Sequence, residues 1–165
     1  KDETVVDQYV SVNGGLLVQD LDKKTIEVNA EMCVTEAKPT AEQIIDLNFG
    51  WRIVKHVKSN AIVVVKDGKT IGVGAGQMNR VGSAKIALEQ APAALAEAGK
   101  DIKAEALVLG SDGFFPFDDT VTLAEQYGVT ALVQPGGSVR DEDSVKRANE
   151  FNMTMLVTGM RHFKH

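Results

Sequence analysis

Residues 72–77 form a glycine-rich turn ahead of a predicted helix, and Arg80 falls in the first turn of that helix. Glycine lets a backbone approach a ligand closely, and a helix start offers free amides and a positive dipole end. Arginine is unfavourable beside that dipole, so its presence indicates an anion to bind. The glycines could instead serve only helix–sheet packing, and both interpretations stay open because the turn does not match the full dinucleotide-binding fingerprint.

Three of the six phenylalanines lie within residues 110–119, in a loop that follows a predicted strand. Such rings, Phe114 among them, can stack on a flat heterocycle. Asp118 or Asp119 is expected to cap the next helix, and one of them could accept hydrogen bonds from ring N–H groups. The alternative is a hydrophobic plug that closes the end of the sheet.

Residues 134–141 follow another predicted strand and contain two glycines directly before Ser138. Consecutive glycines can form a nest of backbone amides that binds an anion. Ser138 and Asp141 have the spacing of a capping box at the start of a helix. Simple loop geometry explains this segment as well as ligand binding does.

The C-terminal residues 158–165 are cationic in an otherwise acidic protein. Arg161 is the best candidate there for holding a phosphate or carboxylate, because its planar fork matches such anions. A frayed basic tail is the alternative for a chain terminus. His162 and His165 have no third metal ligand nearby, so we expect no metal site.

Lys55 and His56 adjoin one another between a predicted helix and a predicted strand, where such a pair could perform acid–base chemistry. A solvated helix end that carries basic residues is the alternative. Asn60 opens the following strand, a position where asparagine is disfavoured, and this indicates a role for its amide.

The chain has 165 residues, of which 44% are hydrophobic and 25% charged, enough for one globular domain with a buried core. Its net charge of −5 and pI of about 5.2 are unfavourable for general nucleic-acid binding. No apolar run approaches the roughly 18 residues that a membrane span needs. We therefore expect neither a nucleic acid nor a membrane as a partner.

One cysteine, Cys33, excludes an intrachain disulfide and a cysteine-rich zinc site, which indicates a reducing compartment. Residues 1–8 are polar and acidic, unlike a signal peptide, so a cytoplasmic location is expected. The sequence does not begin with Met, which indicates a piece of a longer protein.

The elements that must position these residues are clearest after residue 38. Thr40 and Gln43 predict a capping box for a helix ending near residue 57, and Asp67-Gly68 predicts a hairpin turn. A second helix is expected from about residue 77 to a stop before Pro92, followed by a short helix or surface connection. The remaining expected elements are strands at 106–109, 129–133 and 153–157 and helices at 119–127 and 139–151.

Apolar strands separated by helices of this length predict right-handed βαβ units and a parallel sheet. The predicted order, α-β-β-α-β-α-β, is that of the α/β, cytidine-deaminase-like fold, a three-layer α-β-α arrangement with a mixed sheet. Residues 1–38 show little periodicity: 10–19 indicate a strand or hairpin, and 24–34 irregular or edge structure.

Four segments occur in this order along the chain: KHVKSNAIVVVKDGKTIGVGAGQMNRV, SDGFFPFDD, VQPGGSVRDEDSV and TGMRHFKH. Together they resemble the C-terminal part of the bifunctional purine biosynthesis protein, the AICAR transformylase/IMP cyclohydrolase. The resemblance runs from GGLLVQD to the final histidine. It implies that residues 39–165 are the second of two cytidine-deaminase-like repeats of the transformylase. Residues 1–38 are then the tail of the preceding transformylase region or an irregular hairpin.

The resemblance implies transfer of a formyl group from the co-substrate 10-formyltetrahydrofolate to AICAR (5-aminoimidazole-4-carboxamide ribonucleotide), which gives FAICAR on the way to IMP, without a metal. The positions that match AICAR-binding residues of the family are Asn60, Arg80, Phe114 and Arg161. The positions that match residues lining the folate site are Val81, Asp119, Ser138 and Val139.

One departure from the family pattern concerns catalysis. The principal Lys-His pair of the family lies in a KHxNPCG-type motif of the first repeat, and this sequence has no such motif. Lys55 and His56 occupy the equivalent place in the second repeat and remain weak catalytic candidates that do not inherit the proton-acceptor role. The cyclohydrolase domain is also absent.

Family active sites form between repeats and across a homodimer. The missing first repeat and the cyclohydrolase domain are therefore expected partners, and the chain alone is expected to bind weakly and to have no turnover. A non-catalytic nucleotide- or anion-binding module is the alternative function. A deaminase is disfavoured because the zinc ligands are missing.

Overall fold

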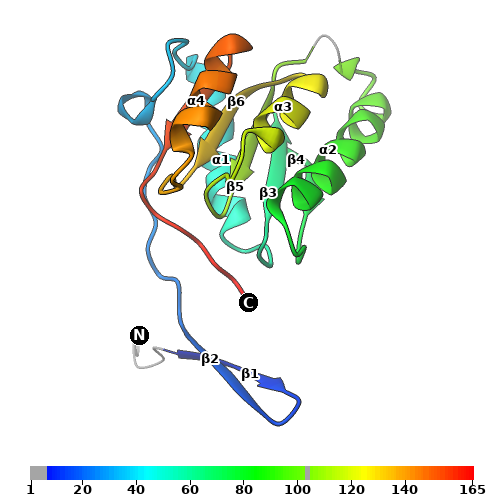
Figure 1. The fold of residues 1–165 in the computed structure, drawn as a ribbon. Helices are drawn as coiled ribbons and strands as arrows, with labels where there is room; N and C mark the ends of the chain where they lie inside the picture. Colours follow the sequence, from blue (N-terminus) through cyan, green and yellow to red (C-terminus); the bar gives the residue numbers. More distant parts are fainter. Residues whose placement is uncertain (1–6, 103–104) are drawn as a thin grey trace.

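A five-stranded mixed sheet lies between helices on both of its faces in the computed structural model, which describes residues 7–102 and 105–165 (Figure 1). The strands, in sheet order, are β4 (Lys69–Gly74), β3 (Ile62–Lys66), β5 (Leu107–Ser111), β6 (Val129–Gln134) and β7 (Thr154–Val157). Strand β3 is antiparallel to both neighbours, whereas β5, β6 and β7 run parallel. The three-layer α-β-α architecture with a mixed sheet, predicted from the sequence, is confirmed.

The helices are α1 (Ala41–Val54), α2 (Arg80–Glu97), α3 (Asp119–Gln126) and α4 (Asp141–Glu150). The observed order is therefore α-β-β-α-β-α-β-α-β. The predicted order was one helix–strand pair short, although the ranges predicted at 139–151 and 153–157 do correspond to α4 and β7.

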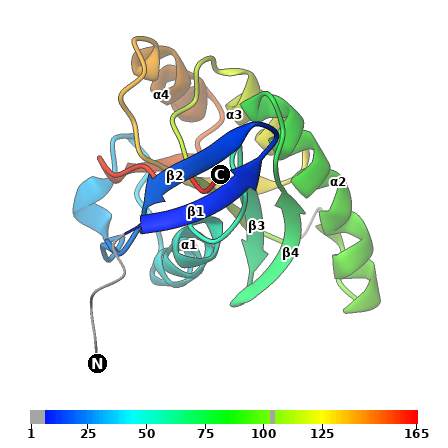
Figure 2. The same ribbon diagram turned by 90° about the horizontal axis from the view of Figure 1, so that it is seen from below.

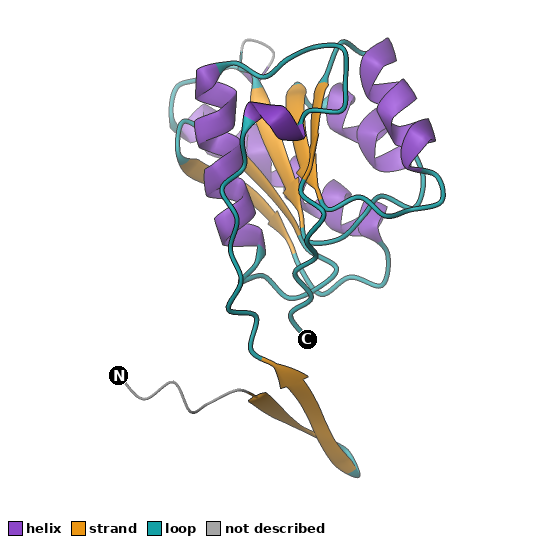
Figure 3. Ribbon diagram, turned by 90° about the vertical axis from the view of Figure 1, so that its left-hand side faces the viewer, coloured by secondary structure: helices purple, strands orange, loops and turns teal. Residues whose placement is uncertain are grey.

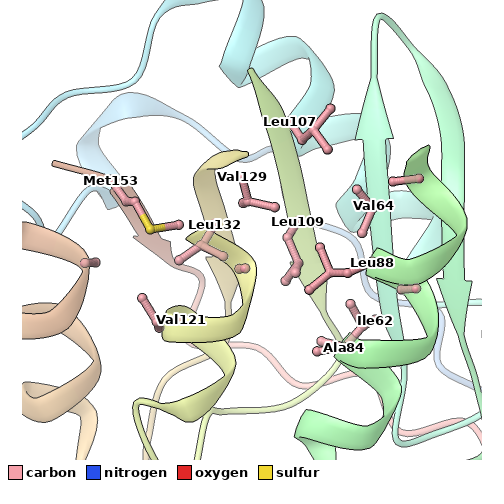
Figure 4. Close-up of a cluster of buried hydrophobic side chains, with 14 of the residues drawn as sticks. Ile62, Val64, Ala84, Leu88, Leu107, Leu109, Val121, Val129, Leu132 and Met153 are labelled. Atoms are coloured by element: carbon pink, nitrogen blue, oxygen red, sulfur yellow. The ribbon is translucent and has the colours of Figure 1, made fainter. Parts of the chain in front are cut away.

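Each face of the sheet has its own hydrophobic core, because successive side chains of a strand point to opposite faces. On one face α1 packs against Val63, Val65 and Val108. On the other face α2, α3 and α4 cover Ile62, Leu109 and Leu132, as Figure 4 shows. These strands are buried on both faces, which explains why the sequence shows apolar runs rather than alternation.

The sequence predicted that the second helix stops before Pro92, and this is wrong: α2 continues through Pro92 to Glu97. Proline lacks the amide that the helix needs and normally breaks it. Ala91 and Leu95 lie one turn apart and are both buried in the core, so their burial holds this turn in place. The predicted connection at 91–104 therefore begins as helix, and its residues 103–104 lie outside the described residues.

A two-stranded hairpin, β1 (Asp7–Val12) and β2 (Gly15–Asp20), stands apart from the five-stranded sheet (Figure 3). It confirms the hairpin predicted within residues 10–19. One of its faces exposes Tyr9, Leu16 and Val18, and the other exposes Val10, Val12 and Leu17. At its foot the Gln19 side chain donates a hydrogen bond to the Phe163 carbonyl.

The segment between the hairpin and α1 contains no strand, so of the irregular or edge structure predicted for residues 24–34 the irregular alternative is the one observed. It contains one short 3-10 turn, η1 (Ala30–Met32), and Cys33 forms an isolated bridge with Leu156 of β7. Val28 is buried in the core beneath α1, and the Asn48 side chain bonds both its amide and its carbonyl.

The turn between β3 and β4 is held by a buried carboxylate. Asp46 of α1 accepts hydrogen bonds from the backbone amides of Asp67 (2.9 Å) and Gly68 (2.7 Å). The predicted Asp67-Gly68 turn is confirmed, and both residues have positive φ. This turn lies at the opposite end of β3 from Asn60.

Two glycines of β4 let α2 pack directly on the strand backbone. A Cβ atom at Gly72 would lie 1.9 Å from the Ala87 carbonyl oxygen, and one at Gly74 would lie 1.9 Å from that of Ser83. For these two positions, close helix–sheet packing explains the glycine-rich segment without a ligand.

We predict that Gly72→Ala lowers the free energy of unfolding by about 1–3 kcal/mol or more, because backbone atoms cannot yield to the added methyl group. Urea denaturation measures this change. Gly15→Ala is the matched control, since a Cβ there has nothing within 4 Å and should change stability by less than about 0.5 kcal/mol. Equal stability of the two variants would contradict the packing argument.

Candidate functional site

Most of the candidate residues lie at one end of the sheet. The parallel strands β5, β6 and β7 end there, and ligands of α/β sheets characteristically bind beyond such strand ends. Figure 2 views the molecule from this side, with the hairpin and the C-terminus in front. Asn60 and Arg80 reach the same end because β3 begins there and α2 starts after β4.

A cavity of about 290 Å³ at this end brings together three of the four residues expected to bind AICAR. Its lining residues are Asn60, Met78, Asn79, Arg80, Phe114, Pro116 and Phe163. The three expected residues are 20 or more positions apart in the sequence, so the fold is what assembles them.

The Arg80 side chain is buried, and its Nη1 atom has several hydrogen-bond acceptors around it. Its Nη1 donates to Asp112 Oδ1, to Ser111 Oγ (3.2 Å) and to the Ala61 carbonyl (3.3 Å). Its Nη2 donates to Asn60 Oδ1 at 2.8 Å. Asp112 is a fully buried carboxylate. The chain itself therefore supplies an anionic partner for the arginine in the first turn of α2.

Asn60 uses its amide in two directions. Oδ1 accepts from Arg80, and Nδ2 donates to the Gln77 carbonyl at 2.9 Å. The Asn60 carbonyl accepts from Ser83 Oγ at 2.6 Å, and the Ser59–Asn60 peptide bond is cis. The two hydrogen bonds of its side-chain amide fix Asn60 beside the Arg80 guanidinium at the cavity wall.

The three phenylalanines of the loop after β5 have different surroundings. Phe115 is fully buried in the core, as expected of a hydrophobic plug that closes the end of the sheet. Phe114 is half-buried and lines the cavity. Phe117 is about half exposed, and the Arg140 guanidinium carbon lies 5.0 Å from its ring centroid. The loop is therefore both a plug and a cavity wall.

Neither Asp118 nor Asp119 caps α3 in the predicted way. Asp118 stands at the N-cap position without a side-chain cap bond, because Arg147 Nε of α4 donates to its carboxylate at 2.8 Å. This hydrogen bond raises the pKa of Arg147. Asp119 Oδ1 accepts only from Thr120 within its own first turn, and Asp119 is exposed.

The predicted capping box before α4 is only half formed. The Ser138 amide donates to Asp141 Oδ1 at 3.2 Å, but Ser138 Oγ accepts from Arg140 rather than from Asp141. The Asp141 carboxylate also accepts from the Gly137 amide, so an internal carboxylate binds amides of the predicted nest. The positions expected to line the folate site, Val81, Asp119, Ser138 and Val139, lie at the starts of α2 and α3 and before α4, and they are not among the residues lining the cavity.

The C-terminal segment is not a frayed tail. His162 is buried, its Nδ1 lies 2.5 Å from Asp22 Oδ2, and its amide donates to the Asp112 carbonyl at 3.0 Å. Its ring lies 4.6 Å from that of Trp51, centroid to centroid. Arg161 is exposed, with its guanidinium carbon 5.9 Å from the ring of Phe163, a residue of the cavity wall.

Lys55 and His56 line a different cavity of about 270 Å³, between the foot of the hairpin and the C-terminal segment. Lys55 Nζ donates to the Lys24 carbonyl at 2.7 Å and lies 3.6 Å from Asp22 Oδ1. His56 is exposed, as the solvated-helix-end interpretation expects. The structure does not bring this pair into the cavity of Asn60 and Arg80.

Sequence reasoning missed Asp112, Asn79 and Phe163. A signal for Asp112 exists in retrospect, because a charged residue directly after an apolar strand needs a buried partner of opposite sign. Phe163 has no local signal. Within the described residues no three His, Cys, Asp or Glu side chains are grouped as metal ligands, and no helix there is long and apolar enough to cross a membrane.

Known proteins resemble this chain over most of its length. "Bifunctional purine biosynthesis protein PurH" of Anoxybacillus flavithermus is 60% identical over 156 residues, and that of Bacillus subtilis is 55% identical over 159. These matches cover 94% and 96% of this chain but only 29% of each relative, so the chain spans less than a third of their length.

One solved structure with a similar outline is a diaminohydroxyphosphoribosylaminopyrimidine deaminase/5-amino-6-(5-phosphoribosylamino)uracil reductase of Thermotoga maritima. Its TM-score is 0.40 at 19% identity, over 68% of this chain and 34% of that one, too low a similarity for conclusions about function. The family described as "AICARFT/IMPCHase bienzyme" matches residues 1–90. Because this match covers more than half of the chain, the chain belongs to the AICARFT/IMPCHase bienzyme family.

Proposed function

We propose that this chain is the C-terminal part of an AICAR transformylase, which transfers a formyl group from 10-formyltetrahydrofolate to the 5-amino group of AICAR. The observation that carries the proposal is the cavity at which Asn60, Arg80 and Phe114 meet. An aromatic wall, a fixed amide and a guanidinium edge are the groups that a flat carboxamide-bearing heterocycle requires.

The residues have separate roles in this proposal. Phe114 and Phe163 wall the heterocycle, while Asn60 and Nη2 of Arg80 hold the carboxamide. Arg161, exposed at the cavity edge, holds the phosphate.

The folate has its own set of residues. Val81, Ser138 and Val139 line the folate site, and the Asp119 carboxylate pairs with N–H groups of the pterin. Ser138 and Asp119 lie at helix starts beyond the sheet.

Formyl transfer forms a bond between the amino nitrogen and the formyl carbon, and it breaks the bond from that carbon to N10 of the folate. One proton leaves the amino group and N10 gains one, so an acid–base group is needed. Lys55 and His56 line a different cavity, which supports assigning the proton transfer to a residue outside this chain.

We further propose that residues 39–165 are the second transformylase repeat and that residues 1–38 belong to the preceding transformylase region. The exposed apolar side chains of the hairpin support a role in contacts with further polypeptide, because an isolated two-stranded hairpin is marginally stable. The assembly would be a homodimer that also contains the first repeat and the cyclohydrolase domain, located in the cytoplasm.

A complementation assay tests this function. We expect no formyl transfer from the chain alone and measurable transfer when the first repeat is added in trans, because only then is the acid–base pair present. Consumption of 10-formyltetrahydrofolate in the presence of AICAR is measured by absorbance.

Activity of the chain alone would show that Lys55 and His56 do serve in catalysis. AICAR binding without transfer in either condition would favour the alternative, a non-catalytic nucleotide- or anion-binding module, which exposed Arg161 would also suit.

We predict that Arg161→Ala weakens AICAR binding at least about tenfold, since a charge-assisted hydrogen bond contributes roughly 1.5–3 kcal/mol. The fold should be unaffected because Arg161 is exposed. Calorimetric titration of the complemented protein measures the affinity. Arg52→Ala removes an exposed arginine of α1 as the control, and an equal loss in both variants would point to long-range charge instead.

A further inference from the structure

The Asp112 side chain is bonded to several segments at this end of the sheet. It is fully buried, and both carboxylate oxygens have partners: Oδ1 accepts from Arg80 and from the Ala61 amide (3.0 Å), and Oδ2 accepts from Ser59 Oγ. Its backbone amide and carbonyl bond Ala61 and His162. Asp112 thereby joins four segments, and each segment contributes a residue to the cavity wall.

The space around Arg80 is also restricted by the next residue, Gly113. A Cβ atom there would lie 2.4 Å from Arg80 Nη2 and 3.0 Å from a ring carbon of Phe163. The guanidinium is therefore held by Asp112 from one side and closely confined by the backbone on another. Such confinement leaves Arg80 one orientation, with Nη2 toward Asn60.

We propose that Asp112 is the positioning residue of the AICAR site: without contacting the ligand, it fixes the Arg80 guanidinium and, through it, the Asn60 amide. This inference rests on the proposed function for the identity of the ligand. A buried arginine without its carboxylate would be an unpaired charge, which is strongly unfavourable, so loss of the Asp112 charge should release Arg80 from its place.

A double-mutant cycle tests the proposal, with affinity for AICAR measured on the complemented protein. Asp112→Asn keeps the side-chain size and removes the charge, and we expect the Kd to rise at least about tenfold. In an Arg80→Gln background the same change should alter the Kd by less than about twofold, because Asp112 acts through Arg80. Equal losses in both backgrounds would overturn the proposal.

A second readout does not depend on AICAR. In the 165-residue chain, NMR signals of the Arg80 Nη protons should be resolved, since two partners restrict rotation of the guanidinium. In Asp112→Asn they should collapse to one averaged signal. Signals that stay resolved in the variant would overturn the positioning role. If the signals collapse in Asp112→Asn while the complemented wild-type protein fails to bind AICAR, the positioning role is supported and the proposed function is rejected.

Asp46→Asn is the matched control for both readouts. Asp46 is another buried carboxylate with two backbone donors, and it lies at the far end of β3. This variant should lose stability in urea while the Kd and the Arg80 signals remain those of the wild type. A purely structural role for Asp112 predicts the same behaviour for Asp112→Asn, which would contradict the proposal.

Discussion

The buried ion pair between Asp112 and Arg80 is the interaction on which the cavity end of this protein depends. Two charges removed from water need close partners for every polar atom, and this pair recruits Ser59, Ala61 and Asn60 to satisfy that need. As a consequence, loop segments with little regular structure are held in place, because each of them forms hydrogen bonds with the Asp112 or the Arg80 side chain.

The signals that predicted the fold correctly are local ones. Both hydrogen bonds of the Thr40–Gln43 capping box are present, and the Asp67-Gly68 turn forms. Both could be predicted because the partners lie no more than three residues apart in the sequence. Two predictions failed where a distant group intervened. Arg147, 29 positions away, takes the side chain of Asp118 from its capping role, and core burial carries α2 through Pro92. No local pattern contains that information.

The candidate site shows the same division. An arginine in the first turn of α2 predicted an anion to bind, and the structure places against it the carboxylate of Asp112, 32 positions away, which that prediction did not name. The family resemblance singled out Asn60, Arg80 and Phe114 as candidates, and the fold brings all three to the wall of one cavity. Phe163 joins that wall only because His162 is buried and bonded to Asp112, a tertiary contact beyond any local pattern.

Several large apolar side chains at this end of the protein are exposed to water. Met78 and Val139 are essentially fully exposed, and the hairpin beside this end presents Tyr9, Leu16 and Val18. Exposed apolar patches of this kind mark contact surfaces. The cavity that the proposed function assigns to AICAR and the cavity lined by Lys55 and His56 are neighbours that share Phe163 in their walls. The proposed function treats this chain, which spans 29% of the length of its Anoxybacillus flavithermus relative, as one part of a composite active site, because none of the residues lining the Asn60–Arg80 cavity is a histidine, a lysine or a carboxylate.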